Sequence, residues 1–180
     1  PGLFAGLFVA RFPDLPVEDD GRLHDPVLRE HFVERVFAFR RLQLLRQARF
    51  SRGAVVAFHS VHKLQLLAHS PEHYRRLGRL VARVKDLPPG RFLDEYAALF
   101  LAALKVQASP RKHVNVLQHV LGYLRPRLTA ADKRELLGQL EDYRRGLVPL
   151  VVPLTLFKHF LRVFDVAYVA GQTYLYPHPK

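Results

Sequence analysis

Three short motifs mark where helices begin in this chain. Each consists of a side chain that can cap a helix, followed by proline: Asp25-Pro26, Ser70-Pro71 and Ser109-Pro110. Proline suits the first helical position because its φ angle is fixed near the helical value and its missing N–H would have no partner there. Each motif therefore predicts a helix that starts at its proline.

Two further start signals and the spacing of apolar residues complete the helix prediction. Ser51 precedes one expected helix, and Thr129 with Asp132 offers a weaker cap for another. Apolar residues recur every three to four positions, as in Leu28 and Phe32, whereas long alternating β-branched runs are absent. We predict helices over residues 26–49, 53–69, 71–86, 91–108, 110–124, 130–145 and 150–164.

The predicted fold is all-α, a single bundle of about seven helices with an N-terminal arm and an extended C-terminal tail. Residues 1–25 are the expected acidic arm, because they hold two arginines against five acidic side chains, and Pro13, Pro16 and Gly21 interrupt their acidic stretch. Residues 26–180 are the expected helical domain. Within it, residues 166–180 lose the helical spacing and are predicted to extend along the body or away from it.

Several chemistries are excluded by composition. The chain contains no cysteine, so it offers no disulfide, thiolate zinc site, iron–sulfur ligation or cysteine nucleophile. Glycine-rich phosphate loops and the common hydrolase motifs are also missing. We therefore predict no cofactor in this chain and assign no catalytic residue. The apolar run Gly2–Ala10 is too short to span a membrane, so we expect a cytoplasmic protein without a membrane partner.

A net charge of +12 points to a polyanionic partner. Lysine and arginine number 28 against 16 acidic residues, and arginine predominates. Guanidinium groups bind phosphate through paired hydrogen bonds and stack on flat rings. A coding bias could explain the preference for arginine over lysine, but it would not explain the excess of positive charge.

Arginines also gather at helical spacing. Arg75, Arg79 and Arg83 are helix neighbours within residues 71–86, and they form a stripe that a phosphate backbone would fit. A solvated helix face is the alternative. The candidate nucleic-acid-binding residues are Arg75, Arg76, Arg79, Arg83, Arg111, Lys112, Arg144 and Arg145.

Polar residues on three predicted helices suggest a selective pocket. His59, His62 and Lys63 share one helix face, and Asn115 and His119 share another. The candidate pocket residues are His59, His62, Lys63, Asn115, His119, Tyr123 and Lys158. We predict no metal site, because lysines adjoin these histidines and oppose cation binding. The alternative is that the histidines pack the interior of the bundle.

Five ordered motifs resemble the YbgA-like family of bacterial proteins, and the match runs from about Phe32 to the C-terminus. The motifs are Phe58-His59-x-x-His62-Lys63, Ala68-His69-Ser70-Pro71, Lys112-His113-x-Asn115-Val116-Leu117-x-His119-x-x-Gly122-Tyr123, Tyr143-Arg144-Arg145-Gly146-x-x-Pro149-Leu150 and Gln172-x-Tyr174-Leu175-x-Pro177-His178-Pro179. Members of this family occur alone or fused behind a desulfidase domain that removes sulfur from thiolated uracil. The resemblance implies a link to sulfur removal from thiolated uridine in tRNA.

The leader adds to this resemblance. Residues 7–23 are similar to the closing segment of the desulfidase domain, which implies that the chain is the C-terminal portion of a fusion or a descendant that lost its front half. The family's desulfidases hold a cysteine-ligated iron–sulfur cluster, so their activity is not expected in a chain without cysteine.

We therefore predict an RNA-binding accessory module that presents tRNA to a desulfidase-type domain or protein. One alternative is an enzyme in its own right, using His59 and His62 with Lys112 or Lys158 on a nucleotide-like substrate. Another is a structural interaction domain in which these motifs pack the bundle.

Overall fold

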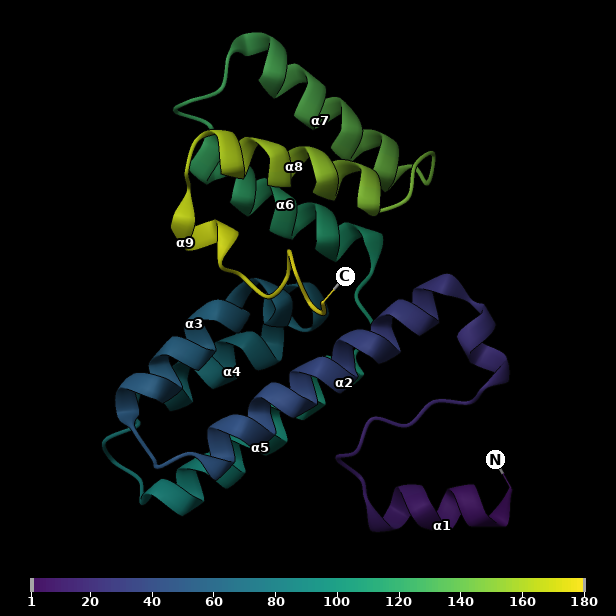
Figure 1. Cartoon of the computed structure of the whole chain (residues 1–180), viewed down its shortest axis with the longest axis vertical. Coiled ribbons are helices and arrows are strands. Elements are labelled where there is room, and N and C mark those ends of the chain that lie inside the picture. The colour runs from purple at the N-terminus through teal and green to yellow at the C-terminus, as the bar shows by residue number, and fades with distance from the viewer. Residues whose placement is uncertain (1, 180) are drawn as a thin grey trace.

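The computed structural model describes residues 2–179, and that part of the chain is helical without any strand (Figure 1). Its elements are α1 (Leu3–Arg11), the 3₁₀ helix η1 (Gly21–His24), α2 (Pro26–Gln47), α3 (Arg52–His69), α4 (Pro71–Ala82), α5 (Pro89–Lys105), α6 (Pro110–Leu124), α7 (Ala130–Arg144), α8 (Val151–Val163) and α9 (Ala167–Ala170). The predicted all-α fold is confirmed. The seven predicted helices correspond to α2 through α8.

Side-chain caps hold the helix starts that the sequence predicts. The Asp25 carboxylate accepts hydrogen bonds from the backbone N–H groups of Val27 and Leu28 at 2.7 and 3.0 Å. Ser70 and Ser109 cap α4 and α6 in the same way. Such caps supply acceptors for N–H groups that have no partner within the helix.

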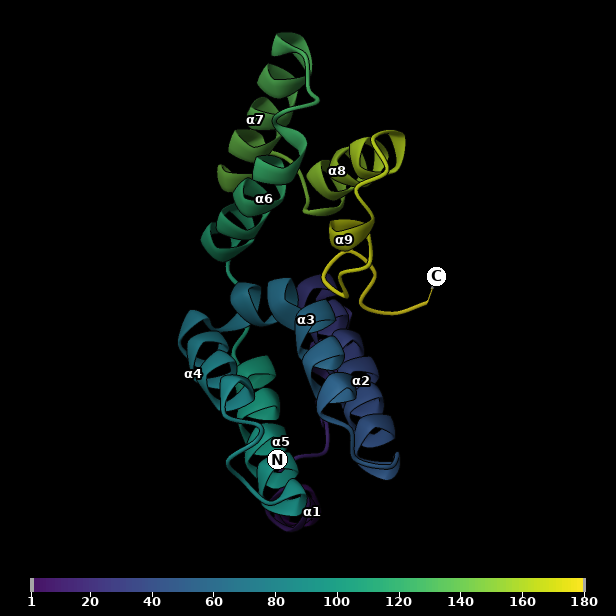
Figure 2. The same ribbon diagram turned by 90° about the vertical axis from the view of Figure 1, so that its left-hand side faces the viewer.

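The helices sort into two groups, each around its own hydrophobic core. Helices α2 to α5 enclose the first core, in which Phe92, Tyr96 and Phe100 are fully buried. Helices α6 to α9 enclose the second, around residues such as Leu117 and Phe157. Figures 1 and 2 show the two groups stacked end to end along the long axis of the molecule.

The C-terminal segment crosses back from the second group to the first. After α9, the side chain of Gln172 donates to the Ser60 carbonyl at 2.9 Å, and the N–H of Thr173 donates to the Val61 carbonyl at 2.9 Å. Tyr174 and Leu175 are buried. The segment predicted as a tail therefore begins with a short helix and then runs over the junction between the groups.

The N-terminal arm contributes few side chains to the hydrophobic cores. No side chain of α1 is buried, although α1 is rich in leucine and phenylalanine. Lys105 of α5 donates to the Pro13 carbonyl at 2.7 Å and attaches the arm to the body. Across residues 2–179, no helix combines the length and apolar character that a membrane crossing requires.

Candidate functional site

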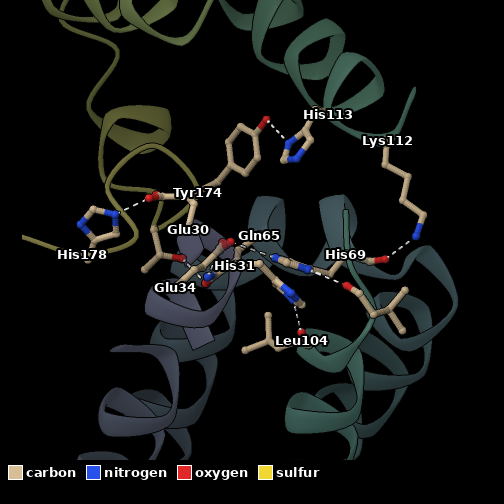
Figure 3. A network of polar contacts seen from close by, with 12 residues as sticks. Glu30, His31, Glu34, Gln65, His69, Leu104, Lys112, His113, Tyr174 and His178 are labelled. Atoms are coloured by element: carbon tan, nitrogen blue, oxygen red, sulfur yellow. Dashed lines mark hydrogen bonds and ion pairs between the residues drawn. The ribbon is translucent and has the colours of Figure 1, made fainter. Parts of the chain in front are cut away.

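A cavity of about 580 Å³ lies where the two groups of helices meet. Its walls come from α2, the end of α3, the α5–α6 connection, α6, α7, α8 and the C-terminal segment. The polar side chains that line it are Glu30, His31, Glu34, His69, Gln107, His113, Tyr143, Lys158, Tyr174, Tyr176 and His178. Figure 3 shows most of them converging from helices that are distant in the sequence. We call this hollow the junction cavity.

A buried ion pair forms one wall of the junction cavity. Nε2 of His69 lies 3.2 Å from the Glu34 carboxylate, and Nδ1 lies 2.7 Å from the Val106 carbonyl oxygen. A carbonyl oxygen and an ionised carboxylate only accept hydrogen bonds, so with Glu34 ionised both ring nitrogens of His69 carry a proton. The Gln65 amide donates to the other Glu34 oxygen at 2.7 Å. Glu34 and His69 are therefore a carboxylate and an imidazolium in direct contact.

The pKa shifts agree with this assignment. Burial opposes the charge on Glu34, but the charge of His69 and the hydrogen bonds from His69 and Gln65 outweigh it and lower the Glu34 pKa. Burial likewise opposes the charge on His69, but Glu34 and the Val106 carbonyl raise the His69 pKa above its ordinary value. Both shifts favour the charged forms, a carboxylate on Glu34 and an imidazolium on His69.

Two further histidines of the cavity are neutral. His31 donates from Nε2 to the Leu104 carbonyl at 2.8 Å, and its ring stacks on His69 with 5.3 Å between centroids. Burial lowers the pKa of His31, and burial lowers that of His113 to about 4. Nδ1 of His113 lies 2.9 Å from the Tyr174 hydroxyl.

The C-terminal segment forms the rim of the cavity. Nε2 of His178 contacts the Glu30 carboxylate at 2.8 Å, and Arg41 donates to the Pro177 carbonyl. The ammonium group of Lys158 lies 4.5 Å from the centre of the Tyr176 ring. The Pro179 carbonyl and Glu30 raise the pKa of His178. Charged contacts thus hold the segment against α2 and α8.

Local sequence signals explain how these groups are positioned. His31 and Glu34 are three residues apart on α2 and share a face. The Ser70-Pro71 motif ends α3 directly after His69. The last carbonyl of α3 then accepts a hydrogen bond from Lys112 of α6 at 2.6 Å. This bond joins the two groups of helices beside the cavity.

The residues predicted to form a selective pocket are not brought together. Of the seven, Lys158 lines the junction cavity. Asn115, His119 and Tyr123 lie exposed on α6. Lys63 is half-buried on α3, beside His59.

His59 and His62 lie in the first core instead. Nδ1 of His59 is 3.2 Å from the Tyr96 hydroxyl, and the His62 ring stacks on Phe58 with 4.1 Å between centroids. Burial lowers the pKa of each histidine to about 4, so both are neutral. These two histidines pack inside the bundle, as the alternative in the sequence analysis describes.

Apart from Lys158, sequence reasoning did not select the residues that meet at the junction cavity. His69, His113, Tyr174 and His178 all occur within the five family motifs, but nothing in their spacing connects them. Glu34 lies outside those motifs. Its position three residues after His31 was an available local signal.

The predicted nucleic-acid-binding residues are distributed over α4, α6 and the end of α7. Acidic neighbours pair with three of them, in the contacts Arg76–Glu72 at 3.7 Å, Arg83–Asp86 at 3.2 Å and Arg144–Glu141 at 2.6 Å. Lys112 is engaged with the His69 carbonyl. Over the described residues, the remaining four, Arg75, Arg79, Arg111 and Arg145, are exposed and form no ion pair.

Metal ligands do not cluster in the described part of the chain. No group of three or more histidine, aspartate or glutamate side chains in residues 2–179 is arranged to hold an ion. Glu30, Glu34 and the histidines of the junction cavity are instead paired with other side chains or with backbone carbonyls.

Comparison with known proteins places the chain among proteins without an assigned activity. A family described as "Protein of unknown function (DUF1722)" matches residues 63–179. The chain is 37% identical over 150 residues to "Uncharacterized protein YbgA" of Escherichia coli (strain K12), and the match covers 81% of this chain and 87% of that protein. No solved structure matches.

Proposed function

The chain belongs to the DUF1722 family of YbgA-like proteins, and on this premise we propose that it is an RNA-binding module that captures tRNA for a desulfidase acting on thiolated uridine. The observation that carries this proposal is the placement of the four unpaired arginines on α4, at the start of α6 and directly after α7, of which α6 and α7 line the junction cavity. The +12 net charge agrees with a polyanionic partner.

Two helix ends place positive charge at the junction cavity. Arg111 follows Pro110 at the start of α6, and Arg145 comes two residues after Tyr143 at the end of α7. Pro110 and Tyr143 both line the cavity. The start of α6 adds the positive end of a helix dipole. A phosphate group near this junction would therefore meet positive charge from two directions.

Helix α4 extends the basic surface along the first group. Leu77 and Leu80 face the core and are buried, whereas Arg75 and Arg79 are exposed one turn apart. Figure 2 shows α4 on the same side of the molecule as α6 and α7, with α2 and the C-terminal segment on the other side. An RNA strand that follows this side would run along α4, α6 and α7, the helices that carry or adjoin the four unpaired arginines.

The desulfidase part of the proposal depends on the resemblance of residues 7–23 to the end of a desulfidase domain. A cysteine-ligated cluster would have to be held by another domain or protein, because this chain has no cysteine. Within such a pair, the present chain would bind and orient the RNA.

A filter-binding titration against tRNA tests the proposal. Each neutralised phosphate releases counterions, so contact with about four phosphates should lower affinity roughly 100-fold between about 50 and 200 mM salt. The double variant R75Q/R79Q should bind at least about tenfold more weakly and show a shallower salt dependence.

The control variant is R40Q/R49Q, which removes the same charge from two exposed arginines on α2 and in the loop directly after it, for which the described residues provide no ion pair; α2 lies across the molecule from α4 (Figure 2). It should bind tRNA within about twofold of the unmodified protein. Absence of tRNA binding, binding that does not change with salt, or equal losses in the two double variants would refute the proposal.

A further inference from the structure

We infer that the junction cavity binds a single planar heterocyclic base, supplied either by a free nucleotide or by an unpaired position in an RNA strand. In its RNA form this inference rests on the function proposed above and deepens it, because it names the part of the RNA that is recognised. In its free-nucleotide form it stands on the cavity alone.

The size and position of the cavity suit a small organic ligand. Its volume of about 580 Å³ lies within the range of about 300–1,000 Å³ that is typical of such sites. Protein interiors are close packed, so a hollow of this size above buried and oriented polar groups is unusual for a purely structural junction. Sites of this kind commonly lie between packed units of a fold.

The walls offer flat and apolar surfaces. Rings from several elements line the cavity, namely His31, His113, Tyr143, Tyr174 and Tyr176. Aliphatic side chains such as Val27, Leu154 and Leu175 complete the lining. Bases stack readily on aromatic side chains, and this interaction contributes about 1–3 kcal/mol per base in other proteins. A flat ring therefore fits this lining better than a compact ion does.

Three neutral polar groups of the cavity suit the edge of an uncharged ring. His31 and His113 are neutral, and each has one ring nitrogen engaged, in contacts with the Leu104 carbonyl and the Tyr174 hydroxyl. Burial raises the pKa of Tyr143 to about 12, so its hydroxyl stays protonated. These groups can both donate and accept hydrogen bonds, as the edge of a base requires.

The buried pair of Glu34 and His69 does not oppose the binding of an uncharged ring. The charges of Glu34 and His69 compensate each other, and both Glu34 oxygens are already bonded, to His69 and Gln65. The pair thus orients the wall without presenting a net charge to a ligand. A phosphate attached to the base would lie outside the cavity, where α6 begins and Arg111 follows.

Calorimetric titration with uridine monophosphate and adenosine monophosphate tests the inference on a matched pair of variants. Val27 lines the cavity and is 60% exposed, whereas Val163 at the end of α8 is 57% exposed and lies outside the lining. Val27→Trp should fill the cavity and weaken nucleotide binding at least about tenfold. Val163→Trp should bind like the unmodified protein, and inorganic phosphate alone should not compete. Circular dichroism melting verifies that both variants fold.

Short oligouridine distinguishes the two sources of the base. Binding of the monophosphates with sensitivity to Val27→Trp supports a free nucleotide as ligand. Binding of oligouridine alone, with the same sensitivity, supports a base from a strand. The inference is overturned if no nucleotide or oligonucleotide binds, if Val27→Trp and Val163→Trp behave alike, or if phosphate alone competes.

Comparison with the tRNA titration keeps this inference separate from the proposed function. If tRNA binding depends on Arg75 and Arg79 but no ligand is affected by Val27→Trp, the cavity is not a base site and the RNA-binding proposal stands. If the monophosphates bind in the cavity and tRNA does not bind, the RNA-binding proposal fails and the base site stands.

Discussion

At the scale of single residues, the pair of Glu34 and His69 sets the chemistry of the junction. Each charge is stabilised by the other and by a further hydrogen bond, from Gln65 or to the Val106 carbonyl. Removing one partner of a buried pair leaves an uncompensated charge, which costs more than the intact pair contributes. The pair is therefore expected to fix the position of α2 relative to α3.

The stabilisation from this pair depends on pH in a defined direction. The pKa of His69 is raised above 6.5, so its contribution is complete below about pH 6.5 and is lost as the pH rises through the raised value. The pKa of Glu34 is lowered below 4.5, so its contribution is complete above about pH 4.5 and is lost as the pH falls through the lowered value. The pair stabilises the fold most between these limits.

The substitution Glu34→Gln should lower the free energy of unfolding by about 3–5 kcal/mol near pH 6. The difference from the unmodified protein should narrow as the pH rises through the His69 pKa. Urea unfolding followed by circular dichroism at several pH values measures it. The double variant E34Q/H69Q should be no less stable than E34Q alone, because it removes the unpaired imidazolium. A loss that stays constant with pH would contradict the ionic assignment.

The neutral buried histidines lower the free energy of unfolding as the pH falls, whereas the ion pair raises it between about pH 4.5 and 6.5. The pKa values of His59, His62 and His113 are lowered to about 4, whereas the unfolded chain takes up these protons near pH 6.5. Unfolding is therefore favoured as the pH falls from about 6.5 to 4. Comparison with E34Q at each pH separates the contribution of the ion pair from this background.

At the scale of helices, α3 connects the two cores. Its middle places His59 and His62 against the first core, Ala68 belongs to the second core, and His69 reaches the junction cavity. A single helix of 18 residues thus contributes side chains to the first core, the second core and the junction cavity. Because Ser51 and the Ser70-Pro71 motif fix both of its ends, these faces are set by the sequence once the helix packs.

Helix caps should contribute measurably to stability. Asp25→Ala should lower the free energy of unfolding by about 1 kcal/mol, because two N–H groups at the start of α2 lose their acceptor. Asp20 lies before η1 and makes no side-chain cap, so Asp20→Ala is the matched control and should change stability by less than about 0.5 kcal/mol. Urea unfolding checks both variants, and equal effects would exclude capping as the cause.

At the scale of the whole molecule, the C-terminal segment fastens the two groups together. Gln172 is almost completely buried, donates to the Ser60 carbonyl at 2.9 Å and accepts from the Leu64 N–H at 3.3 Å. Lys112 makes the second link, to the His69 carbonyl. The cavity lies between these two connections, so its shape depends on both.

Gln172→Ala should lower the free energy of unfolding by about 1–3 kcal/mol, the usual cost of leaving buried groups unsatisfied. It should also weaken the binding of a ligand in the junction cavity. Gln172 holds the C-terminal segment against α3, and the same segment carries Tyr174 and His178, which line the cavity. Gln118 is exposed on α6, and Gln118→Ala serves as the control with little expected effect. Urea unfolding and nucleotide titration measure the two consequences. Unchanged stability of Gln172→Ala would show that the segment does not fasten the groups.

The sequence by itself determined the helices, because capping, proline geometry and apolar spacing act between residues a few positions apart. It also determined the net charge, the exclusion of cysteine chemistry and the family. Only the tertiary structure decided which helix faces meet. Spacing placed His59 and His62 on one face of α3 but could not show that this face turns toward Tyr96. The meeting of Glu34 with His69, and of His113 with Tyr174, joins residues that are 35 and 61 positions apart. Such contacts depend on helix packing and on the return of the C-terminal segment, which no local pattern specifies.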